Sequence, residues 1–474
     1  MRIVKWLCAG LAVCVAALLV LFYLFEMRFE SDGSGRWPLV HFGKKESHYA
    51  ELERNRAEQL KHPAPLAAPA PPAAEAAAAA PVPAAIPTVT AYWTGFRGPN
   101  RDGSYDQTRI LTEWPRAGLK PLWKQPVGGG YSSFVIAGGR AYTIEQRRDQ
   151  EAVTAYDIRT GRELWAHTYP ADFREAMGGD GPRATPAWND GLLYSLGATG
   201  EFRCLDAATG AVRWQKNILE DAGARNINWG MAASPLVVDD KVIVQPGGSP
   251  GRSIVAYNRL TGARVWQSLD DTQAYTSPML VTLAGRRQIV TVTARRVVGI
   301  TVEDGTLLWD YPWVTEYDVN SAQPIIVDSN HVLISAGYGH GAALLNITQR
   351  GGKLNAEQVW ANTRMKNRFA SSVLHGGHIY GFDEAIMACV DARTGDLKWK
   401  GGRYGYGQLL IAGERLIVIT ESGDLVLVKA TPERHEELAK FSAISGKTWN
   451  VPALDDGYLL VRNATQMACF RVAR

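Results

Sequence analysis

Apolar runs that alternate in polarity recur along most of the chain, and a tight turn joins each pair of runs. Before these turns, apolar residues occupy every second position, as at Val153 and Ala155 or at Ile254 and Ala256. This period of two is typical of β-strands with two different faces. Each turn contains a glycine, which can take the positive φ that a short turn between twisted strands requires. The pattern predicts strand, tight turn and strand, repeated many times.

The turn motif is Asp-x-x-Thr-Gly-x-x-x-Trp, and a clear copy runs from Asp391 to Trp399. Its Asp can accept hydrogen bonds from backbone amides within the turn. We expect the Trp to fill a slot between two neighbouring sheets, with its indole N–H bonded to a carbonyl. Successive aromatic residues of the repeat lie 39 (Trp360 to Trp399) to 52 (Trp214 to Trp266) residues apart, and roughly 40–50 residues per four-stranded unit is typical of a β-propeller. These aromatic residues are Trp123, Trp165, Trp214, Trp266, Trp309, Trp360, Trp399 and Phe441.

A second set of landmarks, the expected starts of the inner strands, gives the same number of units. Trp123 precedes the first of these starts, and the last start, Asn450, has no repeat aromatic after it. We therefore expect the strand of Trp123 to complete the sheet that begins at Asn450, because ring closure removes free sheet edges. This predicts an all-β, eight-bladed β-propeller over residues 91–474. The expected starts are Tyr131, Arg183, Ala233, Thr276, Ser321, Phe369, Gly407 and Asn450.

The beginning of the chain has a different character. Arg2 and Lys5 precede an apolar run from Trp6 to Phe25, which is about the length of a membrane-spanning helix. No Ala-x-Ala-like cleavage site follows this run. We predict that residues 1–30 form an uncleaved membrane anchor whose N-terminus lies inside. The alternative is a signal peptide that is removed.

Residues 31–90 are expected to link this anchor to the propeller. The charged stretch from Glu46 to Leu60 could form a short helix. From Pro63 to Pro87 the chain is almost only Ala and Pro, a composition that cannot bury a core and is semi-extended. The tract is therefore interpreted as a spacer.

Charge and cysteine content narrow the possible classes of protein. The chain has 474 residues and a formal charge of only +4, and no cluster of basic residues is interleaved with aromatics, so we do not expect a nucleic-acid partner. Cys8 and Cys14 lie in the apolar run. Cys204, Cys389 and Cys469 occupy a repeat position that is Ala in other copies. A position shared by Ala and Cys is small and buried, so three free, buried thiols are expected.

The segment from Ala91 to Gly103 opens the globular part. Trp93 and Phe96 are expected to pack on the propeller surface. Arg97 and Arg101 are expected to pair with carboxylates or carbonyls rather than to bind a ligand.

Together with the repeat, this opening segment resembles the PQQ-like (pyrroloquinoline quinone) β-propeller family over about Trp93 to Val472. That family includes quinoprotein alcohol dehydrogenases and the outer-membrane protein assembly factor B. The first resemblance implies PQQ and calcium in the central channel, and the second implies protein partners in the cell envelope.

Candidate binding residues lie in the connectors between blades, on the face opposite the Thr-Gly turns. These connectors vary in length, and loops of variable length on a rigid scaffold are where binding usually occurs. Polar and aromatic groups that converge on the channel mouth would suit a planar anionic ligand. Alternatively, they bond to each other and to water and simply close this end of the channel. The candidates are Asp180, Arg183, Asn228, Trp229, Tyr275, Asn320, Lys366, Arg368, Tyr404 and Asn450.

No catalytic or metal-binding residue can be assigned from the sequence. The chain lacks the adjacent cysteine pair of many quinoproteins, and only Asp180 and Asp318 could supply carboxylates near the channel mouth. Calcium needs six or more oxygen ligands. His375 and His378 flank Gly-Gly, and His340 also lies among glycines, so turn positions are expected rather than a metal site.

We therefore expect no cofactor. The predicted function is that of a binding or scaffold protein, anchored in the inner membrane through residues 6–25, whose propeller meets protein partners in the periplasm. The alternative is a PQQ-dependent oxidoreductase that holds the quinone and calcium in its channel.

Overall fold

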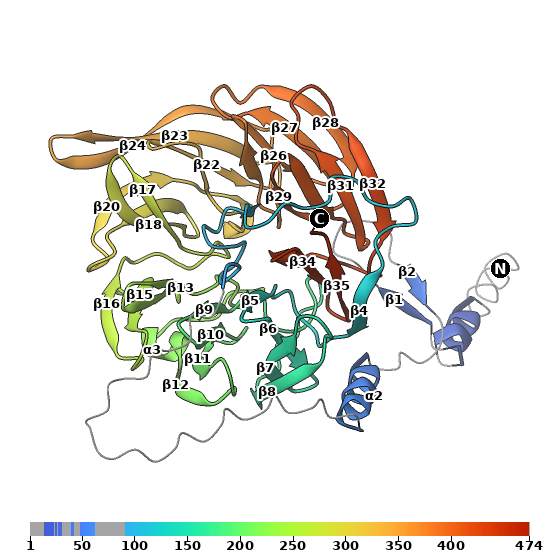
Figure 1. Ribbon diagram of the computed structural model, residues 1–474. Coiled ribbons are helices and arrows are strands. Elements are labelled where there is room, and N and C mark those ends of the chain that lie inside the picture. The colour runs from blue at the N-terminus through green and yellow to red at the C-terminus, as the bar shows by residue number, and fades with distance from the viewer. Residues whose placement is uncertain are drawn as a thin grey trace, which may run out of the picture.

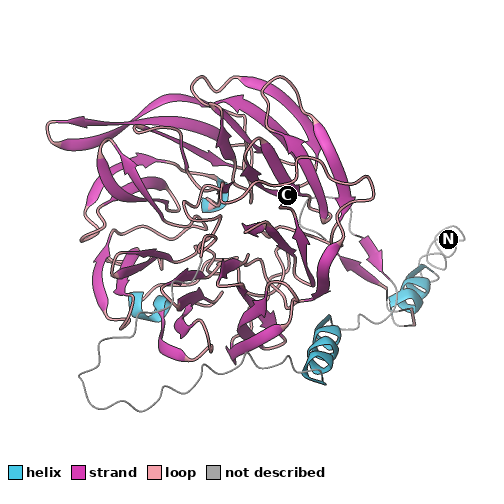
Figure 2. Cartoon of the chain, in the orientation of Figure 1, coloured by secondary structure: helices cyan, strands magenta, loops and turns pink. Residues whose placement is uncertain are grey.

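The computed structural model describes residues 14–22, 24–25, 27–30, 39–41, 48–61 and 91–473. Residues 91–473 form eight sheets. Figures 1 and 2 show these sheets arranged in a ring, and we call the space along its axis the channel. Each sheet is one blade of four antiparallel strands that follow each other outward, and one blade has a fifth, parallel strand at its inner edge. The predicted all-β, eight-bladed propeller is confirmed.

Blades 1 to 4 each consist of four consecutive strands. Blade 1 contains β5 (Val135–Ala137), β6 (Arg140–Arg147), β7 (Gln150–Asp157) and β8 (Glu163–Pro170). Blade 2 contains β9 (Ala187–Asn189), β10 (Leu192–Leu196), β11 (Glu201–Asp206) and β12 (Val212–Asn217), followed by the short helix α3 (Ile218–Ala222). Blade 3 contains β13 (Leu236–Val238), β14 (Lys241–Val244), β15 (Ile254–Asn258) and β16 (Arg264–Ser268). Blade 4 contains β17 (Met279–Leu283), β18 (Arg286–Val292), β19 (Arg296–Ile300) and β20 (Leu307–Pro312).

Blades 5 to 7 continue in the same order. After the 3-10 turn η1 (Glu316–Asp318), blade 5 contains β21 (Ile325–Ile326), β22 (His331–Ala336), β23 (Gly341–Arg350) and β24 (Lys353–Asn362). Blade 6 contains β25 (Val373–His375), β26 (His378–Asp383), β27 (Ile386–Asp391) and β28 (Leu397–Arg403). Blade 7 contains β29 (Gln408–Ala412), β30 (Arg415–Ile419), β31 (Asp424–Lys429) and β32 (Glu437–Ser442), and β3 (Ser104–Tyr105) pairs with β29.

Blade 8 joins the two ends of the propeller. It contains β33 (Ala453–Asp455), β34 (Tyr458–Arg462) and β35 (Gln466–Arg471), and its outer strand is β4 (Pro121–Pro126) from the other end of the domain. Trp123 of β4 stands opposite Cys469 of β35. The predicted closure of the ring is therefore confirmed.

The repeat Trp packs each blade against the turn of the next. Trp214 donates its indole N–H to the carbonyl of Arg259 (3.0 Å), and its ring lies on Gly262. A Cβ at Gly262 would lie 2.8 Å from the ring, so only glycine fits this close approach. The same packing of Trp on turn glycine occurs at Trp123 and Gly161, Trp165 and Gly210, Trp266 and Gly305, and Trp360 and Gly395.

The turns themselves have the expected hydrogen bonds. Oδ1 of Asp157 accepts the backbone N–H groups of Arg159 (3.0 Å) and Thr160 (2.9 Å), and Asp206, Asn258 and Asp391 accept in the same way. Blade 5 departs from the repeat because a long hairpin joins β23 and β24. Trp309 of blade 4 consequently bonds within its own blade, to Oε1 of Gln288 (2.5 Å).

A series of hydrogen bonds beside the inner strands also links blades 1 to 6, and sequence analysis did not anticipate it. The inner strands begin up to four residues later than predicted, as at Ala187 instead of Arg183. The preceding residues bond to the next blade: the backbone N–H of Ser133 donates to Oγ1 of Thr185 (2.9 Å). The series continues from Thr185 to Ser234, from Ser234 to Ser277, from Ser277 to Gln323 and from Gln323 to Ser371.

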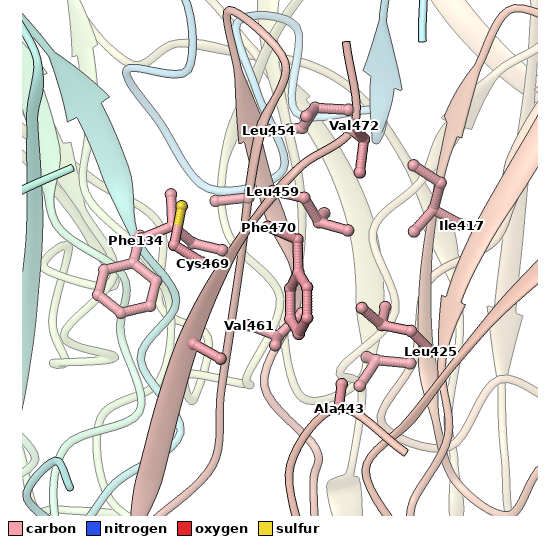
Figure 3. Close-up of a cluster of buried hydrophobic side chains, with 14 of the residues drawn as sticks. Phe134, Ile417, Leu425, Ala443, Leu454, Leu459, Val461, Cys469, Phe470 and Val472 are labelled. Atoms are coloured by element: carbon pink, nitrogen blue, oxygen red, sulfur yellow. The ribbon is translucent and has the colours of Figure 1, made fainter. Parts of the chain in front are cut away.

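The three predicted cysteine positions are confirmed as free and fully buried. Cys204, Cys389 and Cys469 lie in three different blades, and burial raises the pKa of each thiol to about 12. In Figure 3, Cys469 lies on the side of its strand toward Phe134, whereas Phe470 faces Leu425 of blade 7. Cys14 is free and exposed, and Cys8 lies outside the described residues.

The charged stretch before the Ala/Pro tract forms helix α2 (His48–Lys61), as predicted. Arg56 of this helix donates to both carboxylate oxygens of Glu163 in blade 1 (2.9–3.1 Å), and Gln59 donates to Gln125 of β4 in blade 8 (3.1 Å). The helix therefore spans the seam where the ring closes.

Upstream of α2, the short strands β1 (Arg28–Glu30) and β2 (Leu39–His41) pair with each other. Among the described residues, no helix has both the length and the apolar character that a membrane crossing requires. The predicted anchor lies in part, and the Ala/Pro tract entirely, outside those residues.

Replacement of Trp214 by Ala tests the packing between blades. The substitution should lower the free energy of unfolding by about 3–5 kcal/mol, because a large buried ring leaves a cavity between blades 2 and 3. Leu260→Ala is a matched control in the turn that receives this ring, since Leu260 is 60 % exposed. The control should change stability by less than about 0.5 kcal/mol. Denaturant unfolding measures both; equal effects would contradict the packing role.

Candidate functional site

Residues 93–103 cross the channel and form what we call the plug. Arg101 donates from Nη1 to the carbonyls of Ser234 (3.1 Å) and Pro278 (2.9 Å), in blades 3 and 4. Arg97 donates to the carbonyls of Ser372 (3.0 Å) and Leu409 (3.3 Å), in blades 6 and 7. Because these blades lie on opposite sides of the ring, the plug spans the channel.

The beginning of the plug is fixed to the remaining side of the ring. The N–H of Trp93 donates to Oδ1 of Asp455 in blade 8 (3.3 Å), and its carbonyl accepts the N–H of Ile136 in blade 1 (2.8 Å). Trp93 is fully buried. The expectation that Trp93 and Phe96 pack on the propeller surface is therefore corrected: the segment enters the channel, where the inner strands offer carbonyls that the sheets do not use.

The two plug arginines have a structural role, as expected. Both are almost completely buried, and among the described residues neither forms an ion pair. Burial lowers the pKa of Arg97 to about 10 and that of Arg101 to about 9, so both remain charged at neutral pH. Backbone carbonyl dipoles take the place of a carboxylate partner.

Asp455, which accepts the N–H of Trp93 at the start of the plug, should make the stability of the fold depend on pH. Burial is the main cause that raises the pKa of Asp455 from its ordinary value of 3.8 to about 6. The folded state therefore holds this proton more tightly than the unfolded state, and stability contributed by the protonated form is lost as pH rises from about 4 to about 6. Asp455→Asn cannot titrate but keeps an acceptor for Trp93. Unfolding measured at pH 4 and pH 7 should show the variant gaining relative to the natural protein at the higher pH; parallel curves would contradict this.

A cavity of about 430 Å³ lies beside the plug, on the face that carries the connectors between blades. Phe96 of the plug contributes to its wall, and connector residues from several blades form most of the rest. The lining residues are Phe96, Tyr131, Met177, Gly178, Arg183, Trp229, Ala232, Tyr275, Tyr317, Val319, Ser321, Tyr338, Arg368, Phe369, Gln408, Trp449 and Val451.

Aromatic rings dominate this wall and contact one another across blades. The ring of Trp449 lies 5.4 Å from that of Tyr131 and 4.5 Å from that of Phe369. Elsewhere around the cavity, Trp229 lies 5.8 Å from Tyr275, and Tyr317 packs on Tyr338. The cavity is therefore apolar over most of its surface and presents the faces and edges of aromatic rings.

Two arginines interrupt the aromatic wall. The guanidinium carbon of Arg183 lies 4.6 Å from the ring centre of Phe173, and the group donates to the carbonyl of Gly179 (2.6 Å). Burial lowers the pKa of Arg183. Arg368 lies 4.3 Å from the ring centre of Tyr338 and donates to Tyr406 (2.8 Å), while its Nε is buried and has no hydrogen-bond partner.

Among the described residues, neither guanidinium has a carboxylate in direct contact, although Glu175, Asp180 and Glu151 act on Arg183 from a longer distance. In the part of the chain that the structure describes, Arg183 and Arg368 form no ion pair, and the residues that line the cavity include no carboxylate. A cation taken from water without a counter-ion carries a desolvation cost that a bound anion would offset.

Four of the ten predicted candidates line the cavity: Arg183, Trp229, Tyr275 and Arg368. The others have different positions. Asn320 and Asn450 donate to backbone carbonyls of neighbouring segments, as in the alternative in which such residues close the ring. Lys366 pairs with Asp383, and Tyr404 donates to Glu437 (2.6 Å). Asp180 and Asn228 lie in connectors near Gly178 and Trp229 but are not themselves lining residues.

Sequence analysis missed most of the aromatic wall. Tyr338 belongs to the turn between β22 and β23, and such turns lie on the same face as the connectors, so the strand order could have identified it. Trp449 immediately precedes the candidate Asn450. No feature of the sequence identifies Phe96 as a lining residue, because its position depends on the plug entering the channel.

Of the histidines considered as metal ligands, His340 lies in a turn, whereas His375 ends β25 and His378 begins β26 on either side of a Gly-Gly turn. His378 bonds through Nδ1 to the carbonyl of Gly376 (2.9 Å), beside the start of β26. His340 packs edge-on against Trp313, with ring centres 4.3 Å apart. Among the described residues no group of three or more His, Cys, Asp or Glu side chains is placed to hold a metal ion.

Similarity to solved structures extends over most of the chain. The structure of BamB from Moraxella catarrhalis is 15% identical, covers 75% of this chain and 98% of its own, and has a TM-score of 0.52. A europium-containing methanol dehydrogenase is also 15% identical, covers 78% of this chain and 89% of its own, and has a TM-score of 0.59. At these identities the likeness shows the shared propeller fold.

Sequence comparisons identify the family. Outer membrane protein assembly factor BamB of Shewanella oneidensis is 23% identical over 359 residues, or 72% of this chain and 86% of the relative. BamB of Bordetella pertussis is 20% identical over 368 residues, or 69% of this chain and 92% of the relative. The sequence profile described as outer membrane protein assembly factor BamB matches residues 148–401, more than half of the chain. The chain therefore belongs to this BamB family of PQQ-like β-propellers.

Proposed function

We propose that this protein is a membrane-anchored propeller of the periplasm that binds protein partners in the cell envelope. The observation that carries the proposal is the cavity with its aromatic wall and two arginines, which form no ion pair with any residue that the structure describes. The names of its relatives, which are assembly factors of outer membrane proteins, indicate where such partners would be found.

The architecture suits a binding role. Trp packing and the series of hydrogen bonds beside the inner strands link neighbouring blades, and the plug bonds to blades on opposite sides of the channel. The connectors therefore project from a rigid base, and a preorganised surface loses less conformational entropy when a partner binds. Binding, rather than chemistry, is what this arrangement provides.

The alternative is a quinoprotein dehydrogenase, since dehydrogenases of that class share the fold. Calcium takes six to eight oxygen ligands, usually with several carboxylates. The cavity has no carboxylate in its lining, and its charged groups are arginines. The residues present therefore do not fit a calcium and quinone site, and we derive no catalytic step from it.

Added PQQ and calcium provide a direct test of that alternative. A ligand that binds the folded state raises the melting temperature by mass action. We expect no rise when the purified protein is heated with saturating PQQ and Ca²⁺, and no reduction of a redox dye with alcohols or sugars. A rise accompanied by dye reduction would overturn the proposal in favour of the dehydrogenase.

Site-specific photo-cross-linking in the cell envelope tests the binding role. A photo-reactive residue in place of Met177, which is 56 % exposed at the cavity, should capture envelope proteins. The same residue in place of Leu260, equally exposed in a Thr-Gly turn on the opposite face, is the matched control. Capture at Met177 and not at Leu260 is the expected result. Absence of any protein adduct at Met177 would contradict the proposal.

A further inference from the structure

We propose that the cavity binds the carboxy-terminal end of an extended polypeptide whose last residue has an aromatic or large apolar side chain. This inference rests on the proposed function, because the chain end would belong to the protein partner. Three properties of the cavity lead to it: charge, shape and access.

The positive charge of the cavity favours an anionic ligand. The guanidinium groups of Arg183 and Arg368 face the same cavity without a carboxylate partner among the described residues. Arg183 uses its donors on the neutral carbonyls of Gly179 and Gly181. A guanidinium presents a planar fork of N–H groups that matches a carboxylate, and such charge-assisted bonds are stronger than those to neutral acceptors.

Shape limits the ligand to a short apolar segment. A volume of about 430 Å³ lies near the lower end of the range for small-ligand pockets, roughly 300–1,000 Å³. It accommodates the last one or two residues of a chain, not a folded element. Trp229, Tyr275 and Phe369 line it with rings, which pack well against another aromatic or large aliphatic side chain.

Access favours a chain end over an internal acidic residue. The plug crosses the channel beside the cavity, and its two arginines are bonded to blades on opposite sides. A ligand therefore enters from the connector face alone. An internal segment would have to enter and double back within the same narrow space, whereas a free end needs only one strand of chain. Capture of a terminal carboxylate is an established mode of peptide recognition.

Synthetic peptides test the inference with the full-length protein. The probe is an N-acetylated hexapeptide that ends in Phe with a free carboxylate, and binding is measured by calorimetry. We expect the free acid to bind about tenfold or more tightly than the same peptide with a C-terminal amide, because the amide loses the charge-assisted bonds. A peptide that ends in Ala should also bind more weakly. Equal affinity of acid and amide would overturn the inference.

Variants assign the effect to the cavity. Arg368→Gln should reduce affinity for the acid peptide about tenfold and leave the weak binding of the amide nearly unchanged. Arg393→Gln is the matched control, because Arg393 lies in a Thr-Gly turn on the opposite face with its side chain 72 % exposed. Thermal unfolding verifies that both variants fold. An unchanged affinity in Arg368→Gln, or an equal loss in Arg393→Gln, would contradict the assignment.

A last comparison separates a peptide end from a small molecule and from failure of the proposed function. If 3-phenylpropionate binds as tightly as the peptide, the cavity recognises a small aromatic acid and the inference is wrong. If no peptide binds while cross-linking at Met177 still captures envelope proteins, only this inference fails. If neither occurs, the proposed function fails with it.

Discussion

The contact between an indole ring and the turn glycine of the next blade is the interaction on which the whole molecule depends. It appears in successive blades with the same partners: a ring over a glycine that has no side chain, and an N–H bonded to a turn carbonyl. Because this contact links one blade to the next at five of the blade junctions, the packing continues around the ring until the chain meets itself. Closure through β4 and β35 supplies that end. The channel, the plug and the cavity exist only within the closed ring.

Arginines inside the closed ring have different partners from arginines on its outer surface. On the outside, Arg287 pairs with Asp239 at 2.8 Å in a setting where water screens both partners. Inside, Arg97 and Arg101 keep their charge with backbone carbonyls as their partners, because inner strands converge on them from several directions. The same convergence on the connector side leaves Arg183 and Arg368 among aromatic rings. The plug arginines are thus satisfied by backbone carbonyls of the protein itself. On the connector side, Arg183 and Arg368 form no ion pair among the described residues and are available to an anion.

Sequence analysis predicted those features that repeat. The number of blades, the closing strand, the turn hydrogen bonds and the buried cysteines follow from a pattern that every copy shares. The structure also has inner strands that begin later than predicted, since the residues between the landmark and the strand bond to the next blade instead of pairing. Features that occur only once in the chain were harder to predict from the sequence. Asn320 and Asn450 lie near the channel mouth as expected, but their side-chain N–H groups donate to nearby backbone carbonyls instead of facing a ligand. Phe96, Tyr338 and Trp449 meet at the cavity from distant parts of the chain, and no local pattern marks them.

The place of β4 has a consequence for biosynthesis. This strand lies at residues 121–126, yet its only neighbour within the sheet, β35, ends at Arg471 of a 474-residue chain. During translation β4 must therefore remain without its partner until β35 has been made. A chain that stops before β35 leaves β4 unpaired, and an unpaired strand edge is open to aggregation. The architecture thereby distinguishes chains that contain β35 from chains that stop before it.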